Sequence, residues 1–220
     1  MEKILIIGAS GHGRVIADIL KQSPEYELIG FIDSFKRPGI KILDYEVLGS
    51  EETLVTLFKE SGISKGIIGI GDNYTRKQMA DKIMGMIPEF QFINAVHPDA
   101  VISESVSMGN GVAVMAGTVV NPGTKIGNHC IINTKSSIGH DSEIEDFSSV
   151  APGVTVGGHV TLDALSALSI GSVIRNSVKI GRNTLIGAGS LVLNNFGDNV
   201  VAYGNPAKII RKRSLGDQSL

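Results

Sequence analysis

A glycine-rich turn near the N-terminus has the residue types and position of a phosphate-binding loop. Residues 8–13 (GASGHG) follow an apolar run at 3–7 and precede a segment with helical spacing at 14–22. A helix N-terminus presents unpaired N–H groups and the positive end of its dipole to a phosphate. The spacing is G-x-x-G-x-G rather than the dinucleotide pattern G-x-G-x-x-G. We expect a single nucleotide or a nucleotide-linked sugar here; the alternative is a tight turn that binds nothing.

Two further segments are expected at the same edge of the sheet. Asp33 ends the second apolar strand, 20 residues after Gly13, where an acidic side chain contacts a ribose hydroxyl in such sheets. Residues 71–73 (Gly-Asp-Asn) follow the third strand. Because the carboxyl ends of parallel strands share one edge, Gly71 is expected to face the same ligand.

His140 and Asp141 are the strongest candidates for proton transfer. A histidine can accept a proton near neutral pH, and an adjacent carboxylate can hold its ring or raise its basicity. Asn133, seven residues earlier, is expected at the same corner of the fold. Gly158 follows His140 by three steps of a six-residue repeat, and its N–H could donate to a developing oxyanion. The alternative is that these four residues only form turns on the surface of the fold and take no part in chemistry.

The other histidines and the cysteine give weaker signals. His129 and His159 have no neighbouring carboxylate in the sequence, and the spacing of 129, 140 and 159 predicts no close histidine pair. We therefore expect no metal site. Cys130 occupies a position for small residues and is expected to pack.

The elements that position these residues fall into two halves. Over residues 1–96 the order β-α-β-α-β-α-β indicates a parallel sheet with helices on its faces, a Rossmann-like half domain. This half is too short to hold both ends of a dinucleotide, which argues against a nicotinamide-dependent oxidoreductase.

From residue 97 to about 200 the pattern has a period of six. Sixteen consecutive positions from Ile102 to Val192, taken every six residues, are aliphatic. Such a period fits neither a helix nor a flat strand, but it fits a coil of three short strands, with three six-residue steps per turn. We predict a left-handed parallel β-helix, followed by a tail at 201–220 that caps its open end.

Composition limits the function classes. A net charge of −2 argues against electrostatically driven nucleic-acid binding. A single cysteine excludes an intrachain disulfide. The sequence contains no apolar run long enough to span a membrane and no signal-peptide pattern, so we expect a cytoplasmic protein without membrane insertion.

Together these motifs resemble one family, the bacterial sugar acetyltransferases of the sialic acid O-acetyltransferase (NeuD-like) group. The resemblance is greatest to the enzymes that N-acetylate UDP-4-amino-4,6-dideoxy sugars on the bacillosamine pathway of glycan biosynthesis. The motifs that carry it are GASGHG, a strand ending FID, GIGDN, INTKSSIGHD and GNPAK, and they span nearly the whole chain.

The resemblance implies roles for individual residues. His140 would be the general base and Asp141 its partner. The nucleotide sugar would be held by residues of the first half, namely Ser10, Gly11, His12, Asp33, Ser34 and Gly71. Acetyl-CoA would lie between subunits of a homotrimer, near Ser149, Gly158, Ile170 and Ala188. Ser149 replaces a second histidine, and Ser34 replaces an acid, of the family pattern.

The function expected from the sequence is therefore transfer of an acetyl group from acetyl-CoA to the 4-amino group of a UDP-linked amino-dideoxy sugar. One alternative is O-acetylation of a sialic acid-type or polysaccharide hydroxyl. A second is a non-catalytic, nucleotide-sensing trimeric scaffold.

Overall fold

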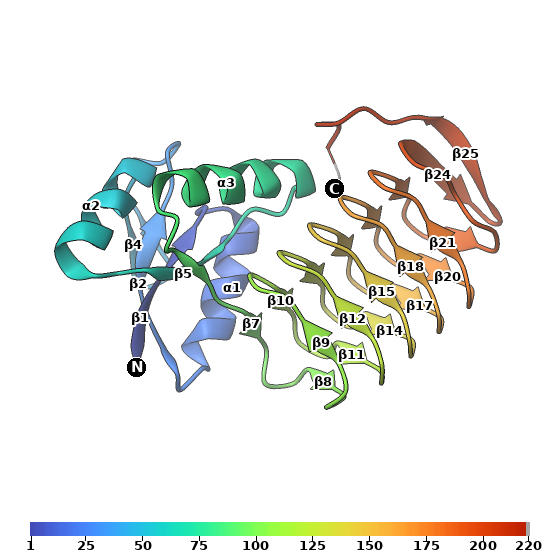
Figure 1. Ribbon diagram of the computed structural model, residues 1–220, viewed down its shortest axis with the longest axis horizontal. Coiled ribbons are helices and arrows are strands. Elements are labelled where there is room, and N and C mark those ends of the chain that lie inside the picture. Colours follow the sequence, from blue (N-terminus) through green and yellow to red (C-terminus); the bar gives the residue numbers. More distant parts are fainter. Residues whose placement is uncertain (219–220) are drawn as a thin grey trace.

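The N-terminal part is a mostly parallel sheet with helices on both faces (Figure 1). The structure is a computed structural model that describes residues 1–218, so the last two residues of the expected tail lie outside it. The sheet order is β3-β4-β2-β1-β5-β6. The strands are β1 (Glu2–Ile7), β2 (Tyr26–Ile32), β3 (Lys41–Ile42), β4 (Tyr45–Gly49), β5 (Lys65–Ile68) and β6 (Gln91–Phe92). The helices are α1 (Gly11–Lys21), α2 (Glu51–Ser61) and α3 (Asn73–Met86).

The alternation of side chains along β1 explains the layers. Ile4 and Ile6 pack in one buried cluster with residues of α1, whereas Leu5 and Ile7 pack in another with residues of α2 and α3. The carboxyl ends of β1, β2 and β5 meet at one edge, which brings the GASGHG turn beside the loops that follow β2 and β5. The sequence did not indicate β3 and β4, which add an edge to the sheet.

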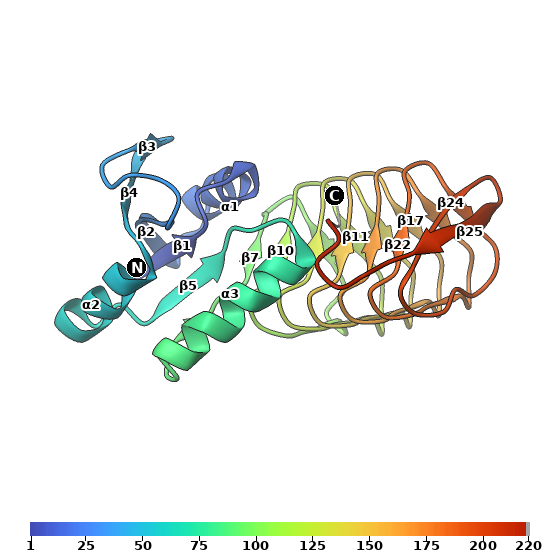
Figure 2. The ribbon, with the colours of Figure 1, turned by 90° about the horizontal axis from the view of Figure 1, so that it is seen from above.

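The C-terminal part is a parallel β-helix with three faces built from two-residue strands (Figure 2). The covered face packs against the N-terminal part and contains β7 (Ala95–Val96), β10 (Ala113–Val114), β13 (Ile131–Ile132), β16 (Ser149–Val150), β19 (Ala167–Leu168) and β22 (Leu185–Ile186). The uncharged face contains β8 (Val101–Ile102), β11 (Val119–Val120), β14 (Ser137–Ile138), β17 (Thr155–Val156), β20 (Val173–Ile174) and β23 (Leu191–Val192). The charged face contains β9 (Ser107–Met108), β12 (Lys125–Ile126), β15 (Glu143–Ile144), β18 (Thr161–Leu162) and β21 (Lys179–Ile180).

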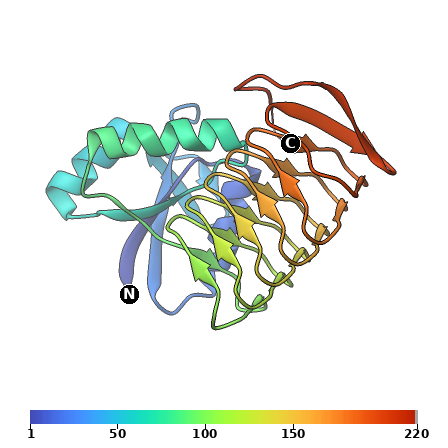
Figure 3. The same cartoon turned by 45° about the vertical axis from the view of Figure 1, so that its right-hand side comes forward.

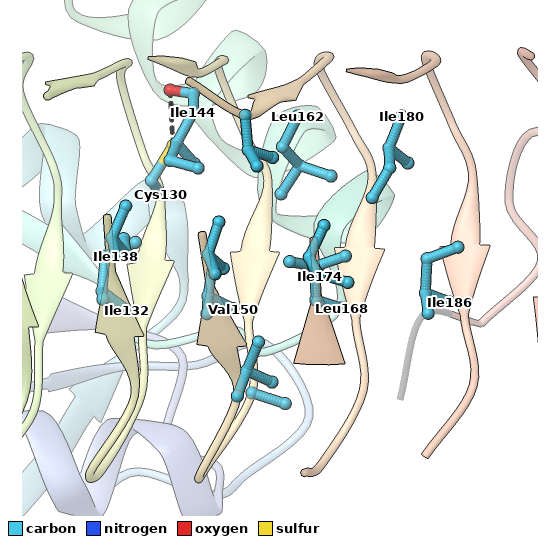
Figure 4. Close-up of a cluster of buried hydrophobic side chains, with 14 of the residues drawn as sticks. Cys130, Ile132, Ile138, Ile144, Val150, Leu162, Leu168, Ile174, Ile180 and Ile186 are labelled. Atoms are coloured by element: carbon cyan, nitrogen blue, oxygen red, sulfur yellow. Dashed lines mark hydrogen bonds between the residues drawn. The ribbon is translucent and has the colours of Figure 1, made fainter. Parts of the chain in front are cut away.

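The six-residue period produces this shape. From Ile102 to Val192 the second residue of each strand points inward and stacks on its equivalent one coil away, as Ile132 does on Val150 (Figure 4). The sulfur of Cys130 packs in the same core, as expected. Every sixth residue from 111 to 189 has a positive φ and turns a corner; eight of these are not glycine, Asp141 and His159 among them. The expected fold class, an α/β part followed by a hexapeptide β-helix, is confirmed.

The tail forms a hairpin that continues the covered face. β24 (Val200–Gly204) pairs in parallel with β22, and β25 (Ala207–Lys212) pairs antiparallel with β24 (Figure 3). Ala202 joins the core of the β-helix, so the hairpin covers part of the last coil. The chain then returns toward the start of α3, where Gly216 lies beside Tyr74. Within residues 1–218, no helix is long and apolar enough to cross a membrane.

Candidate active site

His140 and Asp141 form a hydrogen-bonded pair at the corner between the uncharged and charged faces. Nδ1 of His140 donates to Oδ2 of Asp141 over 2.8 Å, which directs Nε2 away from the carboxylate. This hydrogen bond holds the pKa of Asp141 below its ordinary value. Both side chains are about half exposed, at 55% and 54%. The pair is therefore accessible to a substrate and is arranged to accept a proton at Nε2.

Gly158 lies directly against the imidazole of His140, as the one-coil spacing predicted. A Cβ atom placed on Gly158 would be 2.7 Å from Nε2 of His140 and 2.9 Å from Cε1. Such distances are too short for real side chains, so only glycine lets the ring lie in this position.

Gly158→Ala is therefore expected to displace the His140 ring and to lower kcat by roughly 10- to 100-fold, because small misplacements of a catalytic group are costly. Gly197→Ala is the matched control, since a Cβ there meets nothing within 4 Å. Steady-state kinetics of both variants, with circular dichroism to check folding, measure the effect. Equal kcat values for the two variants would contradict the assigned contact.

His159 belongs to the same cluster, which the sequence analysis missed. Its ring centroid is 4.9 Å from that of His140, and its Nε2 is 3.8 Å from Oδ2 of Asp141. The expectation that no close histidine pair exists was wrong. His159 follows His140 by 19 residues, which is not a whole coil of 18, but the two rings still meet at one corner. His159 lies one coil after Asp141 and so stacks on it, and that spacing was the signal available in the sequence.

The GASGHG turn opens α1 as predicted. Ser10 is the residue that precedes the helix, and its hydroxyl donates to the carbonyl of Gly69 rather than capping the helix. The side chain of Ser10 therefore caps none of the N–H groups in the first turn of α1. The His12 residue is partly exposed, but burial of its ring, followed by the charge of Arg76, lowers its pKa to about 3, so the imidazole is neutral. Its Nε2 atom has no hydrogen-bond partner in the described part of the chain.

A pocket between the two halves brings several of the expected residues together. Gly11, His12 and Gly71 line it from the first half, and Asn133 and Thr134 line it from the β-helix. The cleft thus contains polar groups from both halves, whereas the unpartnered Nε2 atom of His12 is itself shielded from solvent.

The position of Asn133 differs from the expectation. Asn133 follows β13 and lies at the corner between the covered and uncharged faces, whereas His140 lies at the opposite edge of the uncharged face. The two residues do not share a corner, because each six-residue step moves the chain to the next face. Within one chain Asn133 lies in the pocket beside His12 and not beside His140.

Asp33 and Ser34 line a second pocket on the other side of the GASGHG turn, together with Ser10. Oδ2 of Asp33 accepts a hydrogen bond from the N–H of Ala9 over 2.8 Å, and Oδ1 accepts two from the following loop. Asp33 therefore shapes the turn as well as lining the pocket. The Ser34 hydroxyl donates to Glu51, a buried carboxylate that also pairs with Lys82 over 2.8 Å. Sequence reasoning did not find Glu51. Larger hollows near Tyr26, at the amino ends of the strands, contain none of the expected residues.

The expectation that Ser149 contacts the coenzyme was wrong. Ser149 lies on the covered face, is 1% exposed, and donates to Oδ1 of Asn73 over 2.5 Å. It also accepts a hydrogen bond from Arg76 at 3.3 Å. The residue nine positions after His140 is half a coil away from it, on a face that the first half covers, so its hydroxyl is inaccessible to a ligand.

Arg76 is the central residue of the contact between the two halves, and no sequence pattern indicated it. Its guanidinium is buried and donates to the carbonyls of Ile70 and Gly71 in the first half and to those of His129 and Phe147 in the β-helix. Burial lowers the pKa of Arg76 to about 10, so it remains charged at neutral pH. Arg76 thus fixes the loop after β5, which contains Gly71, relative to the β-helix.

Ile170 and Ala188 both lie at the corner between the covered and uncharged faces, on the same edge as Asn133. Ile170 is 61% exposed, although it is a large apolar residue. Gly158 lies on the other edge with His140. The expected coenzyme contacts are therefore divided between the two edges of the uncharged face.

Comparison with known proteins shows which proteins this chain is similar to in sequence and in fold. Residues 3–83 match the PglD N-terminal domain. The chain is similar to the UDP-N-acetylbacillosamine N-acetyltransferase of Bacillus subtilis strain 168, with 30% identity over 121 residues; the match covers 53% of this chain and 52% of that protein. The chain thus aligns with about half the length of this relative.

Several solved structures match over nearly the whole chain, and two of them illustrate the likeness. A variant of the perosamine N-acetyltransferase from Caulobacter crescentus, in complex with CoA and GDP-perosamine, is 33% identical with a TM-score of 0.90, covering 96% of this chain and 98% of that one. The acetyltransferase domain of PglB from Neisseria gonorrhoeae FA1090, in complex with acetyl coenzyme A, is 27% identical with a TM-score of 0.86, covering 95% and 99%. With the sheet, the β-helix and the histidine–aspartate pair in place, the chain belongs to the bacterial sugar N-acetyltransferase family that its motifs resemble.

Proposed function

We propose that this protein transfers an acetyl group from acetyl-CoA to the 4-amino group of a UDP-linked amino-dideoxy sugar. The observation that carries the proposal is the His140–Asp141 pair, whose free Nε2 atom lies against the backbone of Gly158. The similarity to a structure that contains CoA and GDP-perosamine, and to one that contains acetyl coenzyme A, supports this class of substrates. We place the reaction in the cytoplasm, where acetyl-CoA is available.

In the proposed mechanism the amine attacks the thioester carbonyl directly. A C–N bond forms as Nε2 of His140 accepts a proton from the nitrogen, and Asp141 stabilises the imidazolium that results. The backbone N–H of Gly158 donates to the oxyanion. The C–S bond then breaks, the CoA thiolate leaves, and the imidazolium returns a proton to it. No covalent enzyme intermediate is required.

The first half supplies the binding energy that orients the amine. The N-terminus of α1 would hold the phosphates at Ser10, Gly11 and His12, with Asp33, Ser34 and Gly71 nearby. Asn133 extends this pocket onto the β-helix. Contacts remote from the reacting atoms can be used to position them, so a sugar without the nucleotide should react poorly.

We propose a homotrimer whose subunits pack along the uncharged face, with the coenzyme between them. The outward residues of this face are Val101, Val119, Ser137, Thr155, Val173 and Leu191, none of which is charged. Val101, Val119 and Val173 are exposed by 37–63% in the single chain. Exposed apolar surface of this kind is typical of interfaces. Packing around a three-fold axis would also bring His140 and Gly158 of one subunit toward Ile170 and Ala188 of the next.

Val119→Glu is expected to convert the trimer to monomers, because three carboxylates would be buried without partners at the axis-facing surface. Lys125→Glu, on the charged face, is the control and should remain trimeric. Analytical ultracentrifugation gives the masses. A wild-type monomer, or a Val119→Glu variant with the wild-type mass, would refute the proposed interface.

A panel of nucleotide sugars tests the function itself. UDP- and GDP-linked 4-amino sugars, and their 4-hydroxy counterparts, are supplied with acetyl-CoA while free thiol is followed. Turnover with a UDP-linked amine is the expected result. Turnover with the hydroxy sugars alone would indicate an O-acetyltransferase. Nucleotide binding without any thiol release would indicate the non-catalytic scaffold.

A further inference from the structure

The cluster at the active-site corner contains more metal-binding groups than the proposed acetyl transfer uses. Nδ1 of His140 and Nε2 of His159 approach the same oxygen of Asp141, at 2.8 and 3.8 Å. One ligand atom from each of the three residues lies within 4.8 Å of the others. The proposed mechanism needs His140 and Asp141, but it gives His159 no part.

The backbone fixes the three residues relative to one another. His140 and Asp141 belong to the corner after β14, and His159 belongs to the corner after β17, one coil further along. β14 and β17 pair directly, with Ser137 beside Thr155 and Ile138 beside Val156. The corner N–H of His159 also donates to the carbonyl of His140 over 2.9 Å. The site is therefore built on rigid, stacked elements.

Two imidazoles and one carboxylate suit a divalent transition metal such as Zn²⁺. Zinc binds nitrogen and carboxylate oxygen at about 2.0–2.2 Å, which places its tetrahedral ligands roughly 3.3–3.6 Å apart. The distances from Oδ2 of Asp141 to Nδ1 of His140 (2.8 Å) and to Nε2 of His159 (3.8 Å) lie on either side of that value. Rotations of the exposed side chains therefore suffice to coordinate the ion. Each side chain is 54–59% exposed, which leaves the fourth position to water.

We propose that His140, Asp141 and His159 form an inhibitory binding site for Zn²⁺ and similar divalent transition-metal ions. Coordination through Nδ1 of His140 moves the ring proton from Nδ1 to Nε2 by exchange with water. The lone pair that would accept the substrate proton is then lost, and Asp141 is withdrawn from its hydrogen bond. The inhibition rests on the proposed function, whereas the binding does not.

The binding is tested on the untagged, EDTA-treated full-length chain by calorimetry with Zn²⁺ and by visible absorption with Co²⁺. One ion per chain is expected, together with the ligand-field bands of a four-coordinate Co²⁺ site. His159→Asn should weaken binding by at least 10- to 100-fold, since a ligand is lost; asparagine accepts the positive φ of 57° at this corner. His97→Asn is the control, because His97 faces a single carboxylate, that of Asp99, at 3.8 Å.

Three results are distinguishable. Absence of stoichiometric binding, or equal affinity of His159→Asn and wild type, would overturn the site. Zinc that inhibits wild type and His97→Asn, but His159→Asn only at concentrations 10- to 100-fold higher, supports the whole proposal. Stoichiometric binding that leaves acetyl transfer unchanged would support the metal site but contradict the role of His140 as the base.

Discussion

Replacing His140 with alanine is expected to lower kcat for acetyl transfer at least ~100-fold, the loss typical of a missing general base. The side chain is exposed and, within residues 1–218, forms its one side-chain hydrogen bond to Asp141, so the fold should be unaffected. Thiol release under saturating amine and acetyl-CoA measures the change, and a thermal melt verifies the structure. Turnover within a few-fold of wild type would remove His140 from the mechanism.

The substitution Asp141→Asn distinguishes two roles of Asp141, namely holding the His140 ring in place and supplying a negative charge beside it. An asparagine can still accept the hydrogen bond from Nδ1 of His140, but it cannot stabilise the imidazolium. We expect an intermediate loss of kcat, because the positive charge that develops on His140 as it accepts the proton is no longer stabilised by a carboxylate. Thiol release at saturating amine and acetyl-CoA measures kcat, and a kcat equal to that of wild type would show that the charge of Asp141 contributes nothing to proton transfer.

Arg76→Met is expected to be the most destabilising single substitution at the contact between the two halves. It removes the donor for four backbone carbonyls and for the side chains of Asn73 and Ser149 in a buried site. Each buried polar group left unsatisfied costs about 1–3 kcal/mol, and partial rehydration reduces the total, so a loss of roughly 3–5 kcal/mol is expected.

The comparison variant for Arg76→Met is Arg14→Met, because Arg14 is exposed on α1. For a chain of this size the loss of unfolding free energy expected for Arg76→Met corresponds to a fall in Tm of about 10 °C, and none is expected for Arg14→Met. Melting curves should separate the two variants clearly, and the Arg76 variant should also have a higher KM for the nucleotide sugar because Gly71 loses its anchor. Similar Tm values would mean that the guanidinium is not what joins the halves.

The repeat made the β-helix predictable from the sequence, because a fixed period of six directly encodes the inward-pointing positions, such as Ile138 and Val156. The same period predicted that Gly158 lies against His140. The α/β half was also predictable, because apolar strands alternate with amphipathic helices. The short strands β3 and β4 lack such a pattern and were missed.

What the sequence could not supply was the docking of one half on the other. Ser149 and Arg76 contact each other where the covered face meets the first half, and no period in the sequence predicts that contact. The positions of Asn133 and His159, in contrast, follow from the sequence period. One coil is three steps of six residues, and each step moves the chain to the next face. His159 falls one coil after Asp141, and Asn133 falls on the edge opposite His140.

A crystal structure with CoA and a UDP-linked 4-amino sugar tests the central claim most directly. The account predicts that the 4-amino nitrogen lies about 2.6–3.2 Å from Nε2 of His140, with the CoA sulfur beside Gly158 and the nucleotide at the GASGHG turn of a subunit in the same trimer. An amine bound away from His140, or a nucleotide bound elsewhere on the molecule, would contradict it.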